Sequence, residues 1–76
     1  MITVKFFASL REELGYREIS ITPDQPLTVS EIWNRVTQGQ PLPHHVLIAV
    51  NMEYVHQDTL VADGSEVAFF PPVSGG

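Results

Sequence analysis

The C-terminal end of the chain holds the residues with the clearest chemical potential. Residues 67–76 read VAFFPPVSGG, so that an apolar run is followed by two prolines, two linking residues and two glycines. A Pro-Pro pair favours a stiff, extended polyproline II path, and six extended residues reach about 20 Å. The pattern predicts an arm over residues 71–76 that leads away from a folded body.

The tip of this arm offers one reactive group, the α-carboxylate of Gly76. Glycine has no Cβ and adopts any backbone angle, so Gly75 and Gly76 can enter a channel too narrow for other residues. A terminal carboxylate has an ordinary pKa of about 3.5 and is ionised and unreactive at neutral pH. Another enzyme must activate it, and adenylation does so because AMP is a good leaving group. The arm therefore predicts a carrier whose cargo is bonded to its own C-terminus.

No second group of residues suggests an active site. Adjacent His44 and His45 point in different directions without a third ligand at a useful spacing, and His56 is isolated. The serines show no GxSxG nucleophile elbow, and the chain has no cysteine, which excludes disulfides and thiolate catalysis. We expect no bound metal or cofactor and no catalysis by this chain alone.

Composition bounds the class of protein. A chain of 76 residues with 43% hydrophobic residues suits one ordered domain. The formal net charge of −5 disfavours binding to nucleic acid phosphates. No apolar run approaches the roughly 20 residues that span a bilayer, and the N-terminus lacks the pattern of a signal peptide. We expect a cytoplasmic protein with neither nucleic acid nor membrane as a partner.

The first part of the chain predicts two β-strands joined by a short helix. Residues 2–7 and residues 17–22 alternate in the manner of half-buried strands. Between them, Ser9 is a candidate N-cap and Gly15 a candidate stop for one or two helical turns. These two strands can form a hairpin.

Residues 27–39 form the clearest helical segment. Thr28 and Glu31 have the spacing of a capping box. Apolar residues follow at positions i, i+3, i+4 and i+7, which makes one stripe. This stripe consists of Val29, Ile32, Trp33 and Val36. Such a helix must place its apolar face on a sheet.

The second half of the chain predicts the remaining strands. Residues 46–51 are almost continuously apolar, as in a central strand buried on both faces. Residues 51–55 read as a tight turn into a short strand, and residues 66–70 alternate. One main helix on a mixed sheet of four to five strands is an α+β two-layer roll, the ubiquitin-like β-grasp architecture. We assign residues 1–70 to this domain and residues 71–76 to its extended C-terminal Gly-Gly tail.

Exposed aromatic residues predict a partner-binding patch. In this architecture the first and last strands lie side by side and parallel, which places Phe7 and Phe70 on one outer face. A single exposed aromatic side chain needs no explanation, whereas a cluster indicates a function. With Tyr54 these rings form a candidate docking surface. The alternative is that they pack beneath residues 40–45.

Along nearly its whole length the chain resembles the family of small, sulfur-carrying subunits of molybdopterin synthase. The resemblance is carried by VKFFASLRE at residues 4–12, AVNMEYV at residues 49–55 and, above all, DGSEVAFFPPVSGG at residues 63–76. In that family Phe7 and Phe70 would dock both an activating enzyme and the large subunit. Tyr54 stands where the family often has another apolar residue.

The resemblance implies a chemistry for the tail. An E1-like adenylyltransferase would use ATP to form a transient acyl-adenylate at Gly76, and a sulfur donor such as a cysteine desulfurase system would convert it to a thiocarboxylate. The arm would then enter the large subunit, which would hold the catalytic residues. The inserted residues would be Pro71, Pro72, Val73, Ser74 and Gly75.

The resemblance also implies an assembly and a product. Two carriers would supply the dithiolene sulfurs that turn cyclic pyranopterin monophosphate into molybdopterin, the cofactor precursor that binds molybdenum. They would act within a heterotetramer of two small and two large subunits.

Two rival functions stay open. The related sulfur carrier of thiazole (thiamine) synthesis also ends in Gly-Gly, although its chains are typically shorter and lack the FFPPVSGG approach to the tail. A ubiquitin-like protein modifier would instead be joined through its terminal carboxylate to lysines of target proteins. The three readings share the fold and the activated C-terminus and differ in what receives the acyl group or its sulfur.

Overall fold

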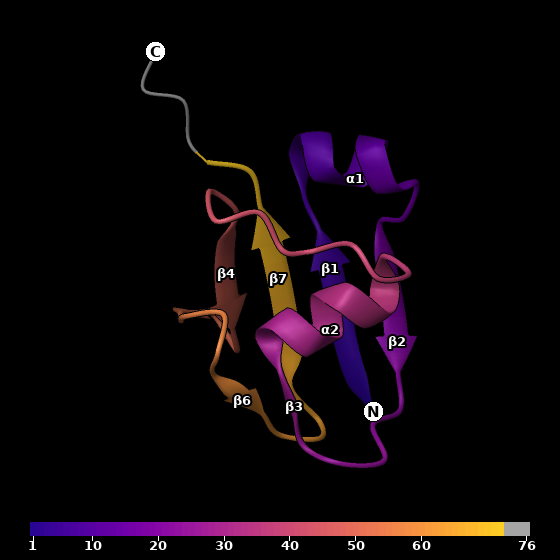
Figure 1. Cartoon of the computed structure of the whole chain (residues 1–76), viewed down its shortest axis with the longest axis vertical. Coiled ribbons are helices and arrows are strands. Elements are labelled where there is room, and N and C mark those ends of the chain that lie inside the picture. Colours follow the sequence, from indigo (N-terminus) through magenta and orange to yellow (C-terminus); the bar gives the residue numbers. More distant parts are fainter. Residues whose placement is uncertain (73–76) are drawn as a thin grey trace.

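A five-stranded mixed sheet forms the frame of the computed structural model, which describes residues 1–72. The strands run in the order β2-β1-β7-β4-β5 (Figure 1). β1 (Ile2–Phe6) and β7 (Glu66–Phe70) are parallel neighbours, while β2 (Glu18–Ile21), β4 (Leu47–Val50) and β5 (Glu53–Tyr54) each pair antiparallel. The predicted mixed sheet of four to five strands is confirmed.

Helix α2 (Val29–Val36) packs on one face of this sheet. The predicted capping box begins it: the Thr28 hydroxyl oxygen accepts from the Glu31 amide at 3.1 Å, and the Glu31 carboxylate accepts from the Thr28 amide at 2.8 Å. These bonds satisfy two amides that a helix N-terminus leaves without partners. The predicted apolar stripe is fully buried and consists of Val29, Ile32, Trp33 and Val36.

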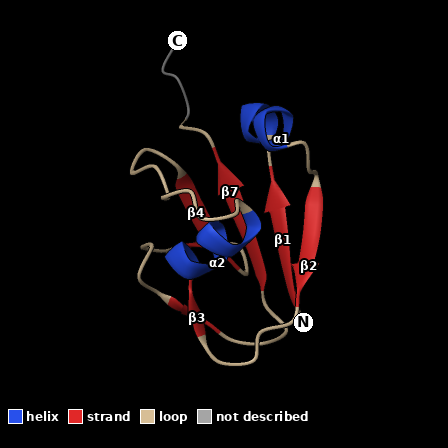
Figure 2. Cartoon of the chain, turned by 45° about the vertical axis from the view of Figure 1, so that its right-hand side comes forward, coloured by secondary structure: helices blue, strands red, loops and turns tan. Residues whose placement is uncertain are grey.

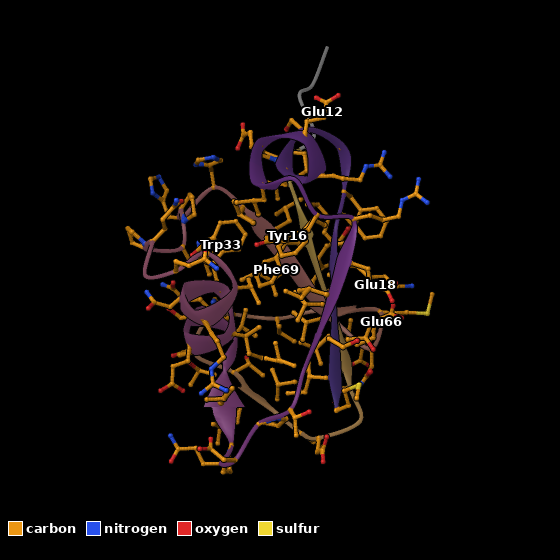
Figure 3. The ribbon with its side chains drawn as sticks, turned by 90° about the vertical axis from the view of Figure 1, so that its right-hand side faces the viewer. Glu12, Tyr16, Glu18, Trp33, Glu66 and Phe69 are labelled. Atoms are coloured by element: carbon orange, nitrogen blue, oxygen red, sulfur yellow. The ribbon has the colours of Figure 1, made fainter. Side chains whose placement is uncertain are left out.

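The core lies between α2 and the inner face of the sheet (Figure 3). The rings of Trp33 and Phe69 meet edge to face, with centroids 4.9 Å apart. The buried strand side chains beneath α2 include Ile2, Val4, Phe6, Ile48, Val67 and Phe69. Figure 3 shows Glu18 and Glu66 on the side of the sheet away from α2. The outer face of the sheet therefore carries polar and exposed groups.

A second, two-stranded sheet joins the start of α2 to the later part of the chain. β3 (Leu27–Thr28) pairs antiparallel with β6 (Leu60–Val61). The Val29 amide continues this pairing by donating to the Thr59 carbonyl at 3.0 Å. The predicted helix over residues 27–39 was therefore too long, since its first two residues are extended and α2 ends at Val36.

Helix α1 (Ala8–Leu14) lies at one end of the sheet, beyond the tips of β1 and β7 (Figure 2). The prediction of Ser9 as its N-cap was wrong. Phe7 occupies that position because its amide donates to the Phe69 carbonyl at 3.1 Å, which keeps the backbone extended up to Phe7. The predicted stop is confirmed: Gly15 is left-handed with φ 81°, and its amide donates to the Arg11 carbonyl at 3.0 Å.

The prediction that residues 46–51 contain an inner strand is confirmed, because β4 lies between β7 and β5. The prediction that this strand is buried on both faces was wrong at Leu47. Leu47 is 37% exposed because its side chain lies on the outer face, which no helix of the described part of the chain covers. The tight turn before the short strand is confirmed, at Asn51 and Met52.

Candidate functional site

Phe7 and Phe70 stack on the outer face of the sheet. β1 and β7 run parallel with Phe6 opposite Phe69, so the residues that follow are also neighbours. The Phe7 and Phe70 ring centroids lie 5.1 Å apart with planes inclined by 10°. Tyr54 joins them, with its centroid 6.2 Å from that of Phe70. The predicted cluster is confirmed as an arrangement of side chains.

The alternative, in which these rings pack beneath residues 40–45, is wrong. Phe7 is 40% exposed and Tyr54 is 74% exposed. Phe70 is half-buried, since it lies between the other two rings. The aromatic surfaces are therefore accessible to another molecule.

Leu47 extends the cluster and was missed in the sequence. It pairs with Phe70 across β4 and β7 and lies on the same outer face. We call Phe7, Leu47, Tyr54 and Phe70 the apolar patch. Apolar residues occupy both faces of β4, so the strand lacks an alternation that would single out Leu47. Leu47 is identified as part of the patch only by its pairing with Phe70 in the register of β4 with β7.

Two alanines form the floor of the apolar patch. Ala49 pairs with both Ala68 and Tyr54 in the registers of β4. Ala49 and Ala68 face outward yet are buried, with 7% and 8% exposure. Because no helix of residues 1–72 covers this face, neighbouring side chains must cover these small residues. The surface of the patch is therefore formed by its large side chains, and the two small alanines lie beneath them.

The apolar patch adjoins the start of the predicted arm. Phe70 is the last residue of β7, and the chain continues directly into Pro71, which is partly buried, and Pro72, which is exposed. In Figure 1 these residues lie at the end of the sheet where α1 is found. The tail residues to which we assigned the chemistry lie outside the described residues: Val73, Ser74, Gly75 and Gly76. A partner that covers the patch would sit beside the root of the arm.

The histidines gather no wider set of ligands. His44 and His45 have rings edge to face with centroids 5.9 Å apart. Among residues 1–72, no three side chains of His, Cys, Asp or Glu are placed to hold a metal ion. Within the same range, neither helix has the length and apolar character that a bilayer crossing requires.

An ion pair lies at the opposite end of the sheet, near the N-terminus (Figure 1). The N-terminal ammonium of Met1 pairs with the Asp63 carboxylate. The hydrogen bond from this ammonium, together with its charge, lowers the pKa of Asp63 below the ordinary 3.8. The Gly64 amide also donates to the Met1 carbonyl at 3.0 Å. These contacts hold the turn before β7 against the start of β1.

Comparisons with known proteins agree with this architecture. The molybdopterin synthase sulfur carrier subunit of Escherichia coli (strain K12) is 38% identical over 85 residues, which covers 100% of both chains. SAMP1, the small archaeal modifier protein 1 of Haloferax volcanii, has a crystal structure that superposes with a TM-score of 0.80 at 28% identity. That match covers 99% of this chain and 98% of the other.

A third match concerns a protein solved together with a partner. It belongs to the protein-protein complex of subunits 1 and 2 of molybdopterin-converting factor from Helicobacter pylori 26695. The TM-score is 0.65 at 22% identity, with 99% of this chain and 97% of the other covered. This likeness concerns the fold. With the other structural matches it confirms the predicted ubiquitin-like β-grasp.

The match to a family extends over residues 4–76, which takes in the last three residues of β1, the apolar patch and the Gly-Gly end. It agrees with the resemblance found in the sequence and with the full-length identity to the bacterial carrier subunit. The chain therefore belongs to the ThiS family and lies close to the sulfur carrier subunits of molybdopterin synthase.

Proposed function

We propose that this chain is the sulfur carrier subunit of a molybdopterin synthase and donates sulfur from a thiocarboxylate at Gly76. One observation carries the proposal: the exposed stack of Phe7 on Phe70 adjoins the root of the arm. Docking of the apolar patch would fix where the arm leaves the complex. The full-length likeness to the Escherichia coli carrier subunit supports this choice within the family.

The proposed chemistry begins with activation of the carboxylate. An oxygen of the Gly76 carboxylate attacks the α-phosphorus of ATP and displaces pyrophosphate, which leaves an acyl-adenylate. A hydrosulfide equivalent from the sulfur donor then attacks the carbonyl carbon, and AMP departs. The sulfur of the resulting thiocarboxylate attacks a side-chain carbon of cyclic pyranopterin monophosphate and displaces an oxygen substituent of that carbon. Water then hydrolyses the acyl–sulfur bond, which leaves the sulfur on the pterin and restores the Gly76 carboxylate. We assign these steps to the cytoplasm.

The chain's own part in these steps is to bind and to position. A cluster of aromatic side chains is typical of the residues that contribute most to an interface. We assign the apolar patch to two successive partners, the E1-like enzyme and the large subunit. The large subunit would supply the catalytic residues, and two copies of each subunit would form the working heterotetramer. That a protein of the same fold from Helicobacter was solved in complex with a second subunit supports only the pairing with a large subunit.

The first test measures the modification itself. The purified chain is incubated with the E1-like enzyme of the same organism, ATP and a sulfur donor, and its intact mass is measured. We expect a mass change equal to one oxygen replaced by sulfur, located at Gly76 by fragmentation. A chain without Gly76 is the control. If the mass change stays absent although the same enzyme preparation modifies a second, established carrier protein, every sulfur carrier function is contradicted.

The second test identifies the pathway. The thiocarboxylated chain is mixed with the large subunit and cyclic pyranopterin monophosphate, and the dithiolene product is measured. Product formation supports the proposal. If sulfur passes only to a thiazole synthase, the chain is the thiamine carrier instead.

The likeness to SAMP1 favours a second candidate function, that of a ubiquitin-like modifier. The same acyl-adenylate would then be attacked by a lysine amine of a target protein, which gives an isopeptide bond and releases AMP. Tagged chain expressed in its own host would appear in larger covalent conjugates that resist reduction and denaturation. Loss of these conjugates on removal of Gly76 would support this second function.

A further inference from the structure

Three of the four positively charged side chains of the whole sequence gather beside the apolar patch. A hollow of about 240 Å³ is lined by Lys5, Arg11 and Arg17, together with Phe6, Phe7 and Glu18. It lies where β1, α1 and the start of β2 meet, at the end of the molecule where the arm begins (Figure 2). The fourth cation, Arg35, belongs to α2. Since the net charge is −5, this hollow is an exception on an acidic protein.

Two of these cations are available to a ligand. Lys5 is held by Glu66, with 3.2 Å between the ammonium nitrogen and the carboxylate oxygen. Arg11 and Arg17 are exposed, and within residues 1–72 no carboxylate oxygen lies within 4.0 Å of either guanidinium. A guanidinium is always charged and binds a carboxylate through two parallel hydrogen bonds. The hollow therefore presents two guanidinium groups suited to carboxylates.

We propose that this hollow binds a carboxylate-bearing segment of the large subunit when that subunit covers the apolar patch. The inference rests on the proposed function, because it describes the partner that function requires. Phe7 belongs both to the patch and to the wall of the hollow. A partner seated on the stacked rings must therefore also face the arginines. The surface of this partner should therefore have an apolar site for the stacked rings, with Asp or Glu side chains at its border to pair with the arginines.

The charge of the hollow affects the orientation in which the partner binds. The rest of this acidic chain repels acidic groups of a partner, whereas the arginines of the hollow attract them. Attraction at one border of an otherwise non-directional apolar contact selects a single orientation and raises the association rate. The arm begins beside both features, so this orientation also sets the direction from which the arm approaches.

A nucleotide is the less suitable occupant. ATP must react at the Gly76 carboxylate, and an arm of six residues can extend about 20 Å from the sheet. The hollow lies at the root of that arm, where bound phosphates would be far from an extended tip. Protein carboxylates are therefore favoured, and binding of a small anion is an outcome that the experiment must detect.

The experiment compares two variants with matched charge changes. Binding to the purified large subunit is measured by surface plasmon resonance at about 50 mM and about 500 mM NaCl, since salt screens exposed charges. We expect Arg11→Gln/Arg17→Gln to weaken binding about tenfold at low salt, mainly through slower association, and to reduce its salt dependence. Arg35→Glu changes the net charge by the same two units at an exposed position on α2, away from the hollow, and should change binding less than about twofold. Circular dichroism verifies that each variant is folded.

Each other outcome overturns a defined statement. If the double variant binds like the wild type, the hollow has no such role, while the proposed function stands. If Arg35→Glu weakens binding as much as the double variant does, only net charge matters and the position of the arginines does not. If inorganic pyrophosphate saturably shifts the arginine side-chain NMR signals at micromolar concentration, the site is one for small anions. If the wild-type chain does not bind the large subunit at all, the proposed function and the inference both fail.

Discussion

Phe69 and Phe70 are adjacent in the chain but lie on opposite faces of β7. Phe69 is completely buried against Trp33, whereas Phe70 stacks on exposed Phe7. The alternation of a β-strand thus divides one Phe-Phe pair between two tasks. The first ring belongs to the core, and the second belongs to the surface that we assign to partners.

This division predicts different losses of stability. Phe69→Ala should lower the free energy of unfolding by about 3–5 kcal/mol, because it removes a buried ring and leaves a cavity. Phe70→Ala should lower it by about 1–2 kcal/mol, because the ring is half-buried. Urea unfolding followed by tryptophan fluorescence measures both. Equal losses would place both rings in the core.

The apolar patch predicts a selective loss of binding. Phe70→Asp should weaken association with the large subunit by more than tenfold, on the order of the effect of a central interface aromatic. Its thermal midpoint should change little by comparison. Met52→Asp is the matched control, because Met52 is 92% exposed at the β4–β5 turn and lies outside the patch. Similar weakening by both substitutions would show that added negative charge, and not the patch, decides binding.

Elements with a complete local signal could be predicted from the sequence. The capping box of α2 and its apolar stripe are encoded within a single segment, and both are present in the structure. The strands β3 and β6 were missed because two residues are too few to display an alternation. Ser9 was misassigned because the start of α1 is decided by the pairing of Phe7 with β7, at the other end of the sequence.

The two hydroxyl residues considered as helix caps give a direct test of that distinction. Thr28→Ala should destabilise the protein by about 1 kcal/mol, because the Glu31 amide loses its acceptor. Ser9→Ala should cost little, since Ser9 lies inside α1 and caps nothing. Denaturant midpoints of the two variants check this. A larger loss for Ser9→Ala would contradict the placement of the start of α1 at Ala8.

The ion pair of Asp63 with the N-terminal ammonium predicts a dependence of stability on pH. The pKa of Asp63 is lowered in the folded protein, so the contribution of the pair is complete above the ordinary 3.8 and is lost as pH falls through the lower folded value. Wild type should therefore exceed Asp63→Asn in stability at pH 7, and the difference should shrink on acidification. The difference in stability between the two proteins should be small, as it is for exposed ion pairs generally.

Urea midpoints at neutral and acid pH measure this difference. Asp58→Asn is the control, because Asp58 is exposed and forms no ion pair with other residues of the range 1–72. A difference between wild type and Asp63→Asn that grows on acidification would contradict the assigned direction of the shift.

The candidate site was predictable to the extent that its residues follow elements with clear signals. Phe7 and Phe70 follow strands that were recognised, so their stacking could be inferred once these strands were taken as parallel neighbours. Leu47 was missed because only its register with β7 distinguishes it. The hollow could not be found either, since Arg11 lies on α1 and Arg17 in the segment between α1 and β2, and no local pattern shows that both line one hollow.

The proposed chemistry at Gly76 makes the length of the arm decisive. Deletion of Gly76, or addition of an alanine after it, should abolish formation of the dithiolene product. The first moves the carboxylate back by one residue, and the second places it on a residue whose Cβ a narrow channel excludes. The thermal midpoint should stay nearly unchanged, because the buried core found among residues 1–72 extends from Ile2 to Phe69. Ser74→Ala preserves the length and should retain activity. A large fall in the midpoint would show that the arm belongs to the fold, and undiminished product from the deletion variant would remove Gly76 as the site of sulfur attachment.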